Sequence, residues 1–311
     1  MKQVKNILVI VDPTAATQPA VAKSMQLAKL LKSSVELFVC DYRAGLDAPA
    51  AAPARTNLIE HRRAMLEEIA APHRKSGIEV SIDAVFDNPL YEGLLKKIAK
   101  SHADLVVKDT HYHNLMRRTL ITNTDWHLIR SSPLPLLLVK PTHWSQQVRA
   151  LAAVDPGHGG DKPAALDRDI CEWTATFAAL MRGEAHAVHM YFPSALIVGS
   201  GAAAGMPMTV ATGAEQQLIE DERRARLQSV QEIATPFGIA PDRIHLMLGS
   251  AVDLLAEEAE RVRADIVVMG AISRSRLKQI FVGHTAERVL DHLPCDVLIV
   301  KPPDFASDLP F

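Results

Sequence analysis

The sequence predicts an α/β fold made of two tandem domains, each with a parallel sheet covered by helices on both faces. Three observations support this. Short apolar strands alternate with amphipathic helices along the chain, the pattern of parallel strands joined by crossover helices. The strands are apolar runs without in–out alternation, so both sheet faces should be buried. The length of 311 residues fits about two domains of ordinary size.

The chain also repeats itself at a fixed spacing. SHADLVVKDT at 101–110 matches VRADIVVMGA at 262–271, and PLPLLLVKP at 133–141 matches PCDVLIVKP at 294–302. Both pairs are 161 residues apart. A constant spacing of this length indicates that a whole domain is duplicated.

The spacing is shorter near the start of each copy. Asp12 and Asp155 both follow a first apolar strand and are only 143 residues apart, so about 18 extra residues lie in the second copy. The Gly-, Ala- and Met-rich stretch at 194–213 is their predicted place. We therefore expect a first domain at 1–141, a linker at 142–147 and a second domain at 148–311, called here the first copy, the linker and the second copy.

Each copy opens with an apolar strand that ends in Asp-Pro, followed by a helix and a second apolar strand. These elements are predicted at 6–12, 18–31 and 34–40 in the first copy, and at 149–155, 162–181 and 184–191 in the second. Each run has a strand or helix length typical of α/β domains, which supports the assignment.

A long amphipathic helix follows a loop in each copy. Its apolar positions fall on one helical face: Leu58, Met65, Leu66 and Ile69 in the first copy, and Leu218, Leu227, Val230 and Ile233 in the second. Both helices are expected to stop at a glycine, Gly77 and Gly238, because glycine is the usual residue just past a helix C-terminus.

A third strand, a helix, a fourth strand, a last helix and a fifth strand complete each copy. The helices are predicted at 89–102 and 250–263, the fourth strands at 103–108 and 264–269, and the fifth strands at 134–140 and 296–301. Each domain is thus expected to be a five-stranded parallel sheet.

Composition excludes several functions. The net charge of −2 and an aromatic content of 5% argue against a protein built to coat nucleic acid. Cys40, Cys171 and Cys295 form no CxxC pair, so we expect buried thiols rather than a disulfide framework or a zinc site. Apolar runs never approach 18 residues, so no membrane span is predicted and a cytoplasmic protein is expected.

The second copy carries the candidate ligand site. In a parallel sheet the ligand crevice lies beyond the carboxyl ends of the strands, at the switch in strand order. Gly270 follows the fourth strand, and Gly283 stands at the predicted start of the last helix. Free N–H groups at a helix start suit a phosphate, and glycine permits close approach. Arg274, Arg276 and Lys278 lie between them, where a phosphate-facing loop and a solvated loop are equally compatible with the sequence.

These residues resemble the universal stress protein family. Its nucleotide-binding members carry Gly, two residues, Gly, nine residues, Gly, then Ser or Thr. Gly270 and Gly283 match the first and third glycines, while Ser273 replaces the second and His284, followed by Thr285, takes the Ser/Thr position. The segments at 110–141 and 281–302 resemble the tandem two-domain members, and the resemblance spans both copies. It implies two Rossmann-like domains.

The resemblance also implies which residues bind a ligand. ATP or another adenine nucleotide would be bound in the second copy by Asp155, Met190, Gly270, Ser273, Arg274, Gly283, His284 and Thr285. The first copy has Asp109, Tyr112, Thr122 and Asn123 at the motif positions. A carboxylate at the first position would repel a phosphate, so the first copy is expected not to hold ATP in this manner.

No metal site and no catalytic centre are predicted. Asp109, His111 and His113 form a DxHxH pattern, but further ligands at a recognisable spacing are missing, and polar loop residues are the favoured interpretation. The chain has no GxxxxGK[ST], GxSxG, HExxH or GxGxxG motif in the required context. An enzyme is therefore not expected, beyond a weak ATPase at most.

Two functions from different classes remain open. The resemblance implies a regulatory role in stress survival, gated by a phosphate-containing ligand in the second copy. The apolar stretch at 194–213, with Met206 and Met208, instead favours a carrier or sensor of an apolar or amphiphilic ligand. A protein-partner module without ligand is a further alternative. As in the family, the two copies are expected to dock through their fifth strands; a homodimer is left open.

Overall fold

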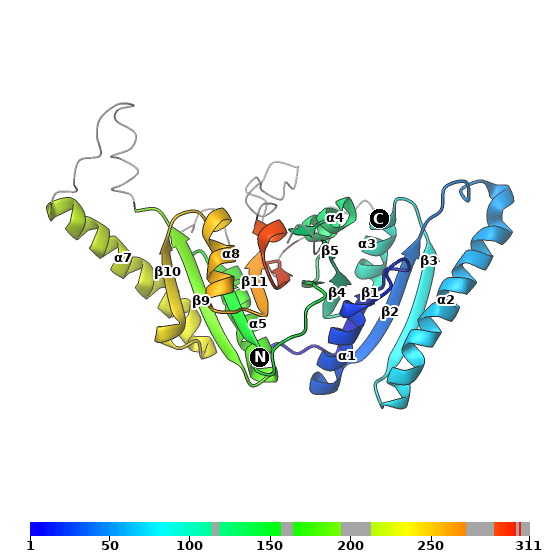
Figure 1. Cartoon of the computed structure of the whole chain (residues 1–311), viewed down its shortest axis with the longest axis horizontal. Coiled ribbons are helices and arrows are strands. Elements are labelled where there is room, and N and C mark those ends of the chain that lie inside the picture. The colour runs from blue at the N-terminus through cyan, green and yellow to red at the C-terminus, as the bar shows by residue number, and fades with distance from the viewer. Residues whose placement is uncertain (114–117, 157–163, 194–212, 272–288, 303–304, 306–311) are drawn as a thin grey trace, which may run out of the picture.

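The computed structural model of the chain describes residues 1–113, 118–156, 164–193, 213–271, 289–302 and 305. Ten strands form one continuous sheet in the order β10-β9-β8-β11-β12-β7-β4-β1-β2-β3. Each half has the order third, second, first, fourth, fifth strand, so the halves meet at their fifth strands. The long helices α2 and α7 lie toward opposite ends of the sheet (Figure 1).

The first copy follows the predicted order with small shifts of the boundaries. Its main elements are β1 (Asn6–Ile10), α1 (Pro19–Leu31), β2 (Ser34–Asp41), α2 (Ala52–Lys75), β3 (Val80–Phe86), α3 (Leu90–Lys100), β4 (Leu105–Asp109), α4 (Asn123–Ser131) and β7 (Leu136–Val139). A 3-10 turn, η1 (Pro49–Ala51), leads directly into α2.

The second copy repeats this order. Its described elements are β8 (Arg149–Ala153), α5 (Ala164–Leu180), β9 (Glu184–Tyr191), α7 (Gly213–Ala234), β10 (Ile244–Leu248), α8 (Ala251–Arg261), β11 (Ile266–Gly270) and β12 (Asp296–Val300). Two 3-10 turns, η2 (Thr235–Phe237) and η3 (Pro241–Arg243), separate α7 from β10. The predicted start of the last helix at Gly283 lies outside the described residues.

The two fifth strands pair with each other. β7 and β12 run antiparallel, with Leu137 opposite Leu298, whereas the strands within each half pair parallel. The predicted α/β class with parallel five-stranded halves is confirmed, and this seam between β7 and β12 makes the complete sheet mixed. The predicted domain and linker boundaries stay a prediction.

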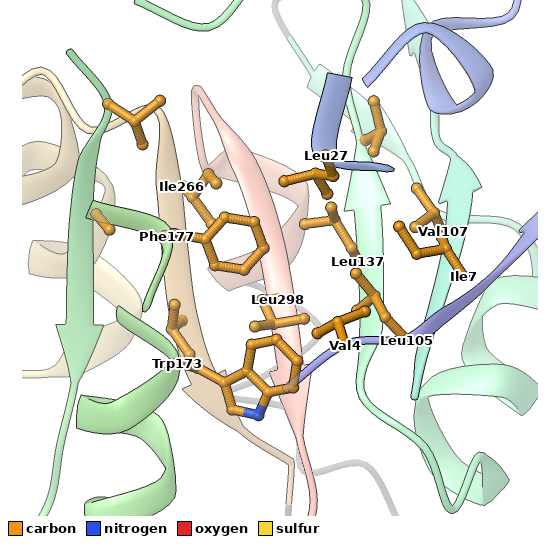
Figure 2. Close-up of a cluster of buried hydrophobic side chains, with 14 of the residues drawn as sticks. Val4, Ile7, Leu27, Leu105, Val107, Leu137, Trp173, Phe177, Ile266 and Leu298 are labelled. Atoms are coloured by element: carbon orange, nitrogen blue, oxygen red, sulfur yellow. The ribbon is translucent and has the colours of Figure 1, made fainter. Parts of the chain in front are cut away.

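The hydrophobic core covers both faces of the sheet and crosses the seam. On one face, α1, α2, α5 and α7 bury a cluster that includes Leu27, Leu137, Phe177 and Leu298 from both copies. Figure 2 shows these side chains gathered on both sides of the seam. The other face packs against α3, α4 and α8. Burial on both faces explains why the strands lack in–out alternation.

Local signals act as predicted at the helix ends. Gly77 and Gly238, just beyond the long helices, have φ of 87° and 79°, a left-handed conformation that glycine adopts without strain. α7 ends earlier than predicted, at Ala234, because Pro236 lies in the tighter turn η2. A short hairpin, β5 (His111–His113) and β6 (Arg118–Leu120), follows β4 and was not predicted.

Buried polar contacts also cross the seam. The Lys23 Nζ on α1 lies 2.6 Å from Asp296 Oδ2 at the start of β12. The Asp296 carboxylate also accepts from the Lys140 backbone N–H at 2.8 Å and from the Trp144 Nε1–H at 2.7 Å. Asp296 is fully buried and Lys23 is 6% exposed. One carboxylate of the second copy thus fixes a helix, a strand end and the linker region of the first.

Lys140 and Lys301 make reciprocal contacts next to the seam. The Lys140 Nζ donates to the Leu293 carbonyl of the second copy, and the Lys301 Nζ donates to the Arg130 carbonyl of the first. Burial lowers the pKa of both ammonium groups, for Lys301 to about 8. Since both lysines end a fifth strand and occupy equivalent positions, the contacts follow the internal repeat.

Candidate functional site

The candidate crevice of the second copy lies at the carboxyl ends of β8 and β11. These neighbouring strands are the switch point, because β9 and β10 extend the sheet to one side and β12 to the other. The register pairs Ala153 with Met269, which brings the residues that follow both strands to the same edge. A ligand of a parallel α/β sheet is expected there.

Asp155 stands at this edge, just beyond β8. Its backbone N–H donates to Asp167 Oδ1 at 3.1 Å, and Asp167 is a buried residue of α5. The Asp155 side chain is 39% exposed. The backbone is therefore fixed from α5 while the side chain stays partly exposed at the switch point.

His189 on β9 lies beside Asp155 and is almost fully buried, at 1% exposure. Its Nδ1 is 3.1 Å from the Val154 carbonyl oxygen, which only accepts, so the proton is on Nδ1. The same Nδ1 is 3.7 Å from Asp155 Oδ1. Burial lowers the pKa of His189, so the ring is neutral at neutral pH. Its Nε2 is buried with no hydrogen-bond partner among the described atoms.

Met190 points to the opposite face of the sheet from its neighbour His189. It is half-buried and packs against the cluster beneath α8, as strand alternation requires. Lining of a base pocket by Met190 stays a prediction.

Gly270 ends β11 at a position without room for a side chain. A Cβ there would lie 2.8 Å from Leu166 Cδ2 on α5. Glycine lets α5 pack directly on the end of the fourth strand. It also leaves the switch point of the second copy without a side chain at this position.

The rest of the predicted motif lies outside the described residues. This applies to Ser273, Arg274, Gly283, His284 and Thr285, and to Arg276 and Lys278. The described residues therefore bring Asp155 and Gly270 to one crevice, while the phosphate-binding part of the motif stays a prediction.

The first copy fills the equivalent crevice with Asp109. Its Oδ1 accepts the Ala20 backbone N–H at 2.7 Å, at the start of α1. Burial, with the nearby charge of Asp12, raises the pKa of Asp109 to about 6, against the opposing effect of the Ala20 hydrogen bond. A buried carboxylate thus stands at the end of the fourth strand of the first copy and is held by the start of α1.

Thr122 and Asp125, further along the first copy, have a structural role. The Asp125 backbone N–H donates to Thr122 Oγ1, and the Asp125 carboxylate accepts the Thr122 backbone N–H at 2.8 Å. This reciprocal pair is a capping box that starts α4. Asp125 is fully buried and pairs with Lys108 Nζ at 2.7 Å. The first copy therefore uses the third-glycine position of the motif to begin a helix.

The structure shows one further hollow, beside the loop that follows β2. It has a volume of about 500 Å³, is open to solvent and is lined in part by Arg43, Asn57 and His61. Among the described residues, no three His, Cys, Asp or Glu side chains are grouped so as to hold a metal ion. Nor is any helix of the described parts long and apolar enough to cross a membrane.

Comparison with known families gives a match in both halves. The model described as "Universal stress protein family" matches residues 3–140 and 151–301. The Universal stress protein E of Escherichia coli K12 is 28% identical over 318 residues, covering 99% of this chain and 97% of that protein. The Universal stress protein E homolog of Haemophilus influenzae is 27% identical over 309 residues, covering 96% and 97%.

Solved structures share the fold over nearly the whole chain. A functionally unknown Pseudomonas aeruginosa protein superimposes with a TM-score of 0.75 at 24% identity, covering 97% of this chain and 94% of that one. A universal stress protein from Archaeoglobus fulgidus gives a TM-score of 0.68 at 15% identity, covering 96% and 98%. These likenesses concern the arrangement of both halves.

Proposed function

The chain belongs to the universal stress protein family, and from this premise we propose that it is a regulatory protein of stress survival. It binds an adenine nucleotide or a related phosphate ligand in the crevice of the second copy. It acts in the cytoplasm and through ligand-dependent contacts rather than strong catalysis. ATP hydrolysis is weak at most.

The observation that carries this proposal is the contrast at the end of the fourth strand. The second copy has Gly270, where α5 packs without room for a side chain, and the first copy has the carboxylate of Asp109. A carboxylate at the end of the fourth strand repels an anionic ligand, whereas a glycine at this position does not. The phosphate ligand is therefore assigned to the second copy.

Asp155 supports the same assignment. Its carboxylate is 39% exposed at the switch point, and its backbone is fixed by Asp167. A fixed carboxylate at this edge suits hydroxyl groups, which donate hydrogen bonds to it. We propose that Asp155 accepts from the ribose of the nucleotide, while the segment from Gly270 to Thr285 approaches the phosphates.

The first copy completes a dimer-like unit. We propose that the β7–β12 pairing keeps the two copies docked in solution, so that the first copy supports the ligand-binding one. The buried contacts of Asp296 with Lys23, Lys140 and Trp144 support a fixed arrangement.

The experiment compares two matched variants by calorimetric titration of the full chain with ATP and AMP. Asp155→Asn removes the carboxylate of the second copy and is expected to weaken binding about tenfold or more, the effect of losing one charged hydrogen bond. Asp12→Asn, the equivalent change in the first copy, should leave affinity unchanged. Gly283→Asp should abolish binding. Equal losses in the Asp12 and Asp155 variants would refute the assignment to the second copy.

A second candidate function rests on exposed apolar side chains. Phe192, Leu248 and Leu218 are 57%, 59% and 54% exposed. Phe192 follows β9 and Leu248 ends β10, two paired strands, and Leu218 lies near the start of α7. Large exposed apolar groups at one edge are a common mark of a binding surface. An apolar or amphiphilic ligand carried beside the 194–213 stretch fits this feature.

The two candidates are separated by a probe of different chemistry. If the second candidate holds, titration calorimetry should show that the full chain binds oleate. The double variant Phe192→Ser and Leu248→Ser should lose this binding. ATP binding should survive that change. Absence of oleate binding in the unchanged protein would eliminate the carrier function.

A further inference from the structure

A charged triad links the outer strands of the first copy to a helix. Lys97 on α3 places its Nζ 2.6 Å from Glu36 Oε1 on β2 and 3.0 Å from Asp83 Oδ2 on β3. One cation thus pairs with two carboxylates. The triad contains no histidine.

At the three equivalent positions of the second copy, the acidic residue is on the helix and the basic residue types are on the strands. His186 on β9 and His245 on β10 replace the two carboxylates, and Glu258 on α8 replaces the lysine. Glu258 is 161 residues after Lys97, the spacing of the repeat. The Glu36, Asp83 and Lys97 triad of the first copy therefore corresponds to a triad with two histidines, His186 and His245, in the second.

Hydrogen-bond directions in the second copy require both rings to be neutral. The Arg261 guanidinium only donates, and its Nη2 lies 3.0 Å from His245 Nδ1, so that nitrogen accepts. The proton of His245 is then on Nε2, which donates to His186 Nδ1 at 3.1 Å. The proton of His186 is consequently on Nε2, which faces Glu184 Oε2 at 3.7 Å. Donated hydrogen bonds thus run in one direction from Arg261 through His245 to His186, whose Nε2 makes none with the described atoms.

The charged groups around the two rings come from several elements. They are Arg149 on β8, Glu184 on β9, Asp242 and Arg243 on η3, and Glu258 and Arg261 on α8. Most of their charge is already paired. Arg261 makes two bonds to the buried Glu258 carboxylate, at 2.6 and 2.7 Å, and Arg243 lies 2.8 Å from Glu184.

We propose that His186 and His245 form an acid-sensitive contact between β9, β10 and α8, which loosens the outer edge of the second copy when the rings are protonated. A proton on His186 Nδ1 would face the Nε2–H of His245. A proton on His245 Nδ1 would face the Arg261 guanidinium and displace it from Glu258. In either case a donor meets a donor, and one contact of the series is lost.

The direction of the pH effect follows from burial. Burial lowers the pKa of both rings below the ordinary value of 6.5, against the attraction of Glu184 and Glu258. The unfolded chain therefore binds protons more readily than the folded one. The stabilisation is present above pH 6.5 and is lost as the pH falls below it. The first copy has no histidine at the three equivalent positions, which are Glu36, Asp83 and Lys97.

Loosening of this edge would reach the ligand crevice. His186 and His189 share the strand β9 and, three residues apart, lie on its opposite faces, so a change in the position of the strand moves both. Acid would thus alter one of the two copies selectively. This inference concerns the packing of the edge and holds with or without a nucleotide in the second copy.

The first test uses the unchanged protein. Nitrogen NMR of the histidines at pH 7.5 should show both His186 and His245 as neutral rings protonated on Nε2, with titration midpoints below 6.5. Any other protonation site, or a midpoint at or above 6.5 for both, would overturn the inference.

The second test is hydrogen exchange by mass spectrometry between pH 7.5 and 5.5, corrected for the intrinsic rate. Protection of β9 and β10 should fall below pH 6.5, by up to about tenfold for each histidine and pH unit. Strands β2 and β3 are the internal control and should keep their protection. An equal loss at both edges would contradict the proposal.

A variant transfers the first copy's triad into the second. Replacing His186→Glu, His245→Asp and Glu258→Lys should abolish the extra acid loss in β9 and β10. His189 is retained, so a pH response from that buried ring would persist and be recognised. His102→Gln, an exposed histidine of the first copy, is the matched control and should leave the response intact. Persistence of the full response in the triple variant would overturn the proposal.

Discussion

The two copies have different residues at the equivalent end of the fourth strand. In the first copy the Asp109 carboxylate accepts a hydrogen bond from the start of α1. In the second copy Gly270 has no side chain, and Leu166 packs beside it. The parallel strands and their order are the same in both halves. Strand order thus fixes which strand ends meet at the switch point, and the residue at one of these ends, Asp109 or Gly270, differs between the copies.

Equivalent positions of the two copies also differ at the outer edges of the sheet and at the seam between β7 and β12. Lys97 joins two carboxylates in the first copy, whereas in the second copy His245 lies 3.7 Å from Glu258 and contacts His186. At the start of the fifth strand the second copy has the buried Asp296, whereas Pro135 stands at the equivalent position of the first. The two copies therefore differ at charged positions in the seam and at the outer edge, while the buried lysines Lys140 and Lys301 are the same in both.

The largest expected loss of stability comes from removing the carboxylate of Asp296 at the seam. Asp296→Ala leaves the buried Lys23 ammonium without its counter-charge and removes the acceptor for Lys140 and Trp144. Breaking a buried ion pair on one side costs about 3–5 kcal/mol. Urea unfolding followed by circular dichroism should show a loss of this size. Glu220→Ala, on the exposed face of α7, is the control and should change stability by less than about 0.5 kcal/mol.

A smaller loss of stability is expected from exchanging the residues that directly precede the second strand of each copy, Ser33 and Gly183. Ser33 fits in the first copy and donates to the Val4 carbonyl, whereas a Cβ at Gly183 in the second copy would overlap the Val148 carbonyl oxygen. Gly183→Ser should therefore cost about 2–3 kcal/mol through overpacking against backbone. Ser33→Gly should cost about 1 kcal/mol through the lost hydrogen bond. Thermal unfolding of both variants checks the asymmetry, and equal losses would contradict it.

Much of the fold could be predicted because its signals are local. The apolar strands, the amphipathic faces of α2 and α7 and the glycines beyond them all lie within short stretches of sequence. The hairpin β5–β6 could not, because strands of three residues carry no detectable period. The 3-10 turn η1 that leads into α2 could not be predicted either, because the periodicity of the helix does not reveal it.

Contacts between distant residues were less accessible from the sequence. Lys23 and Asp296 are 273 positions apart, and nothing in either local stretch indicates that they meet. The pair His186 and His245 becomes recognisable only when the copies are aligned by strand register, since each histidine alone resembles an ordinary strand residue. Asp155 and Gly270 were predicted because both follow strands at the switch point, where topology alone brings residues together.

The last prediction contrasts the pH responses of the two copies. Burial raises the pKa of Asp109 to about 6, above its ordinary 3.8, so the folded state favours the protonated carboxyl. The cost of the buried charge is present above pH 6 and disappears as the pH falls toward 4. Asp109→Asn removes that charge while an amide oxygen can still accept from Ala20. It should stabilise the protein by about 1–2 kcal/mol at pH 7.5.

The gain should shrink as the acid form becomes populated in the unchanged protein, so the two unfolding midpoints in urea should converge near pH 4. The first copy would thus gain stability from acid in the range in which His186 and His245 make the second copy lose it. A gain from Asp109→Asn that is independent of pH would show that the carboxyl is not titrating near 6. Because the fold is the same in both halves, such opposite signs can come only from the few side chains at the strand ends and outer edges.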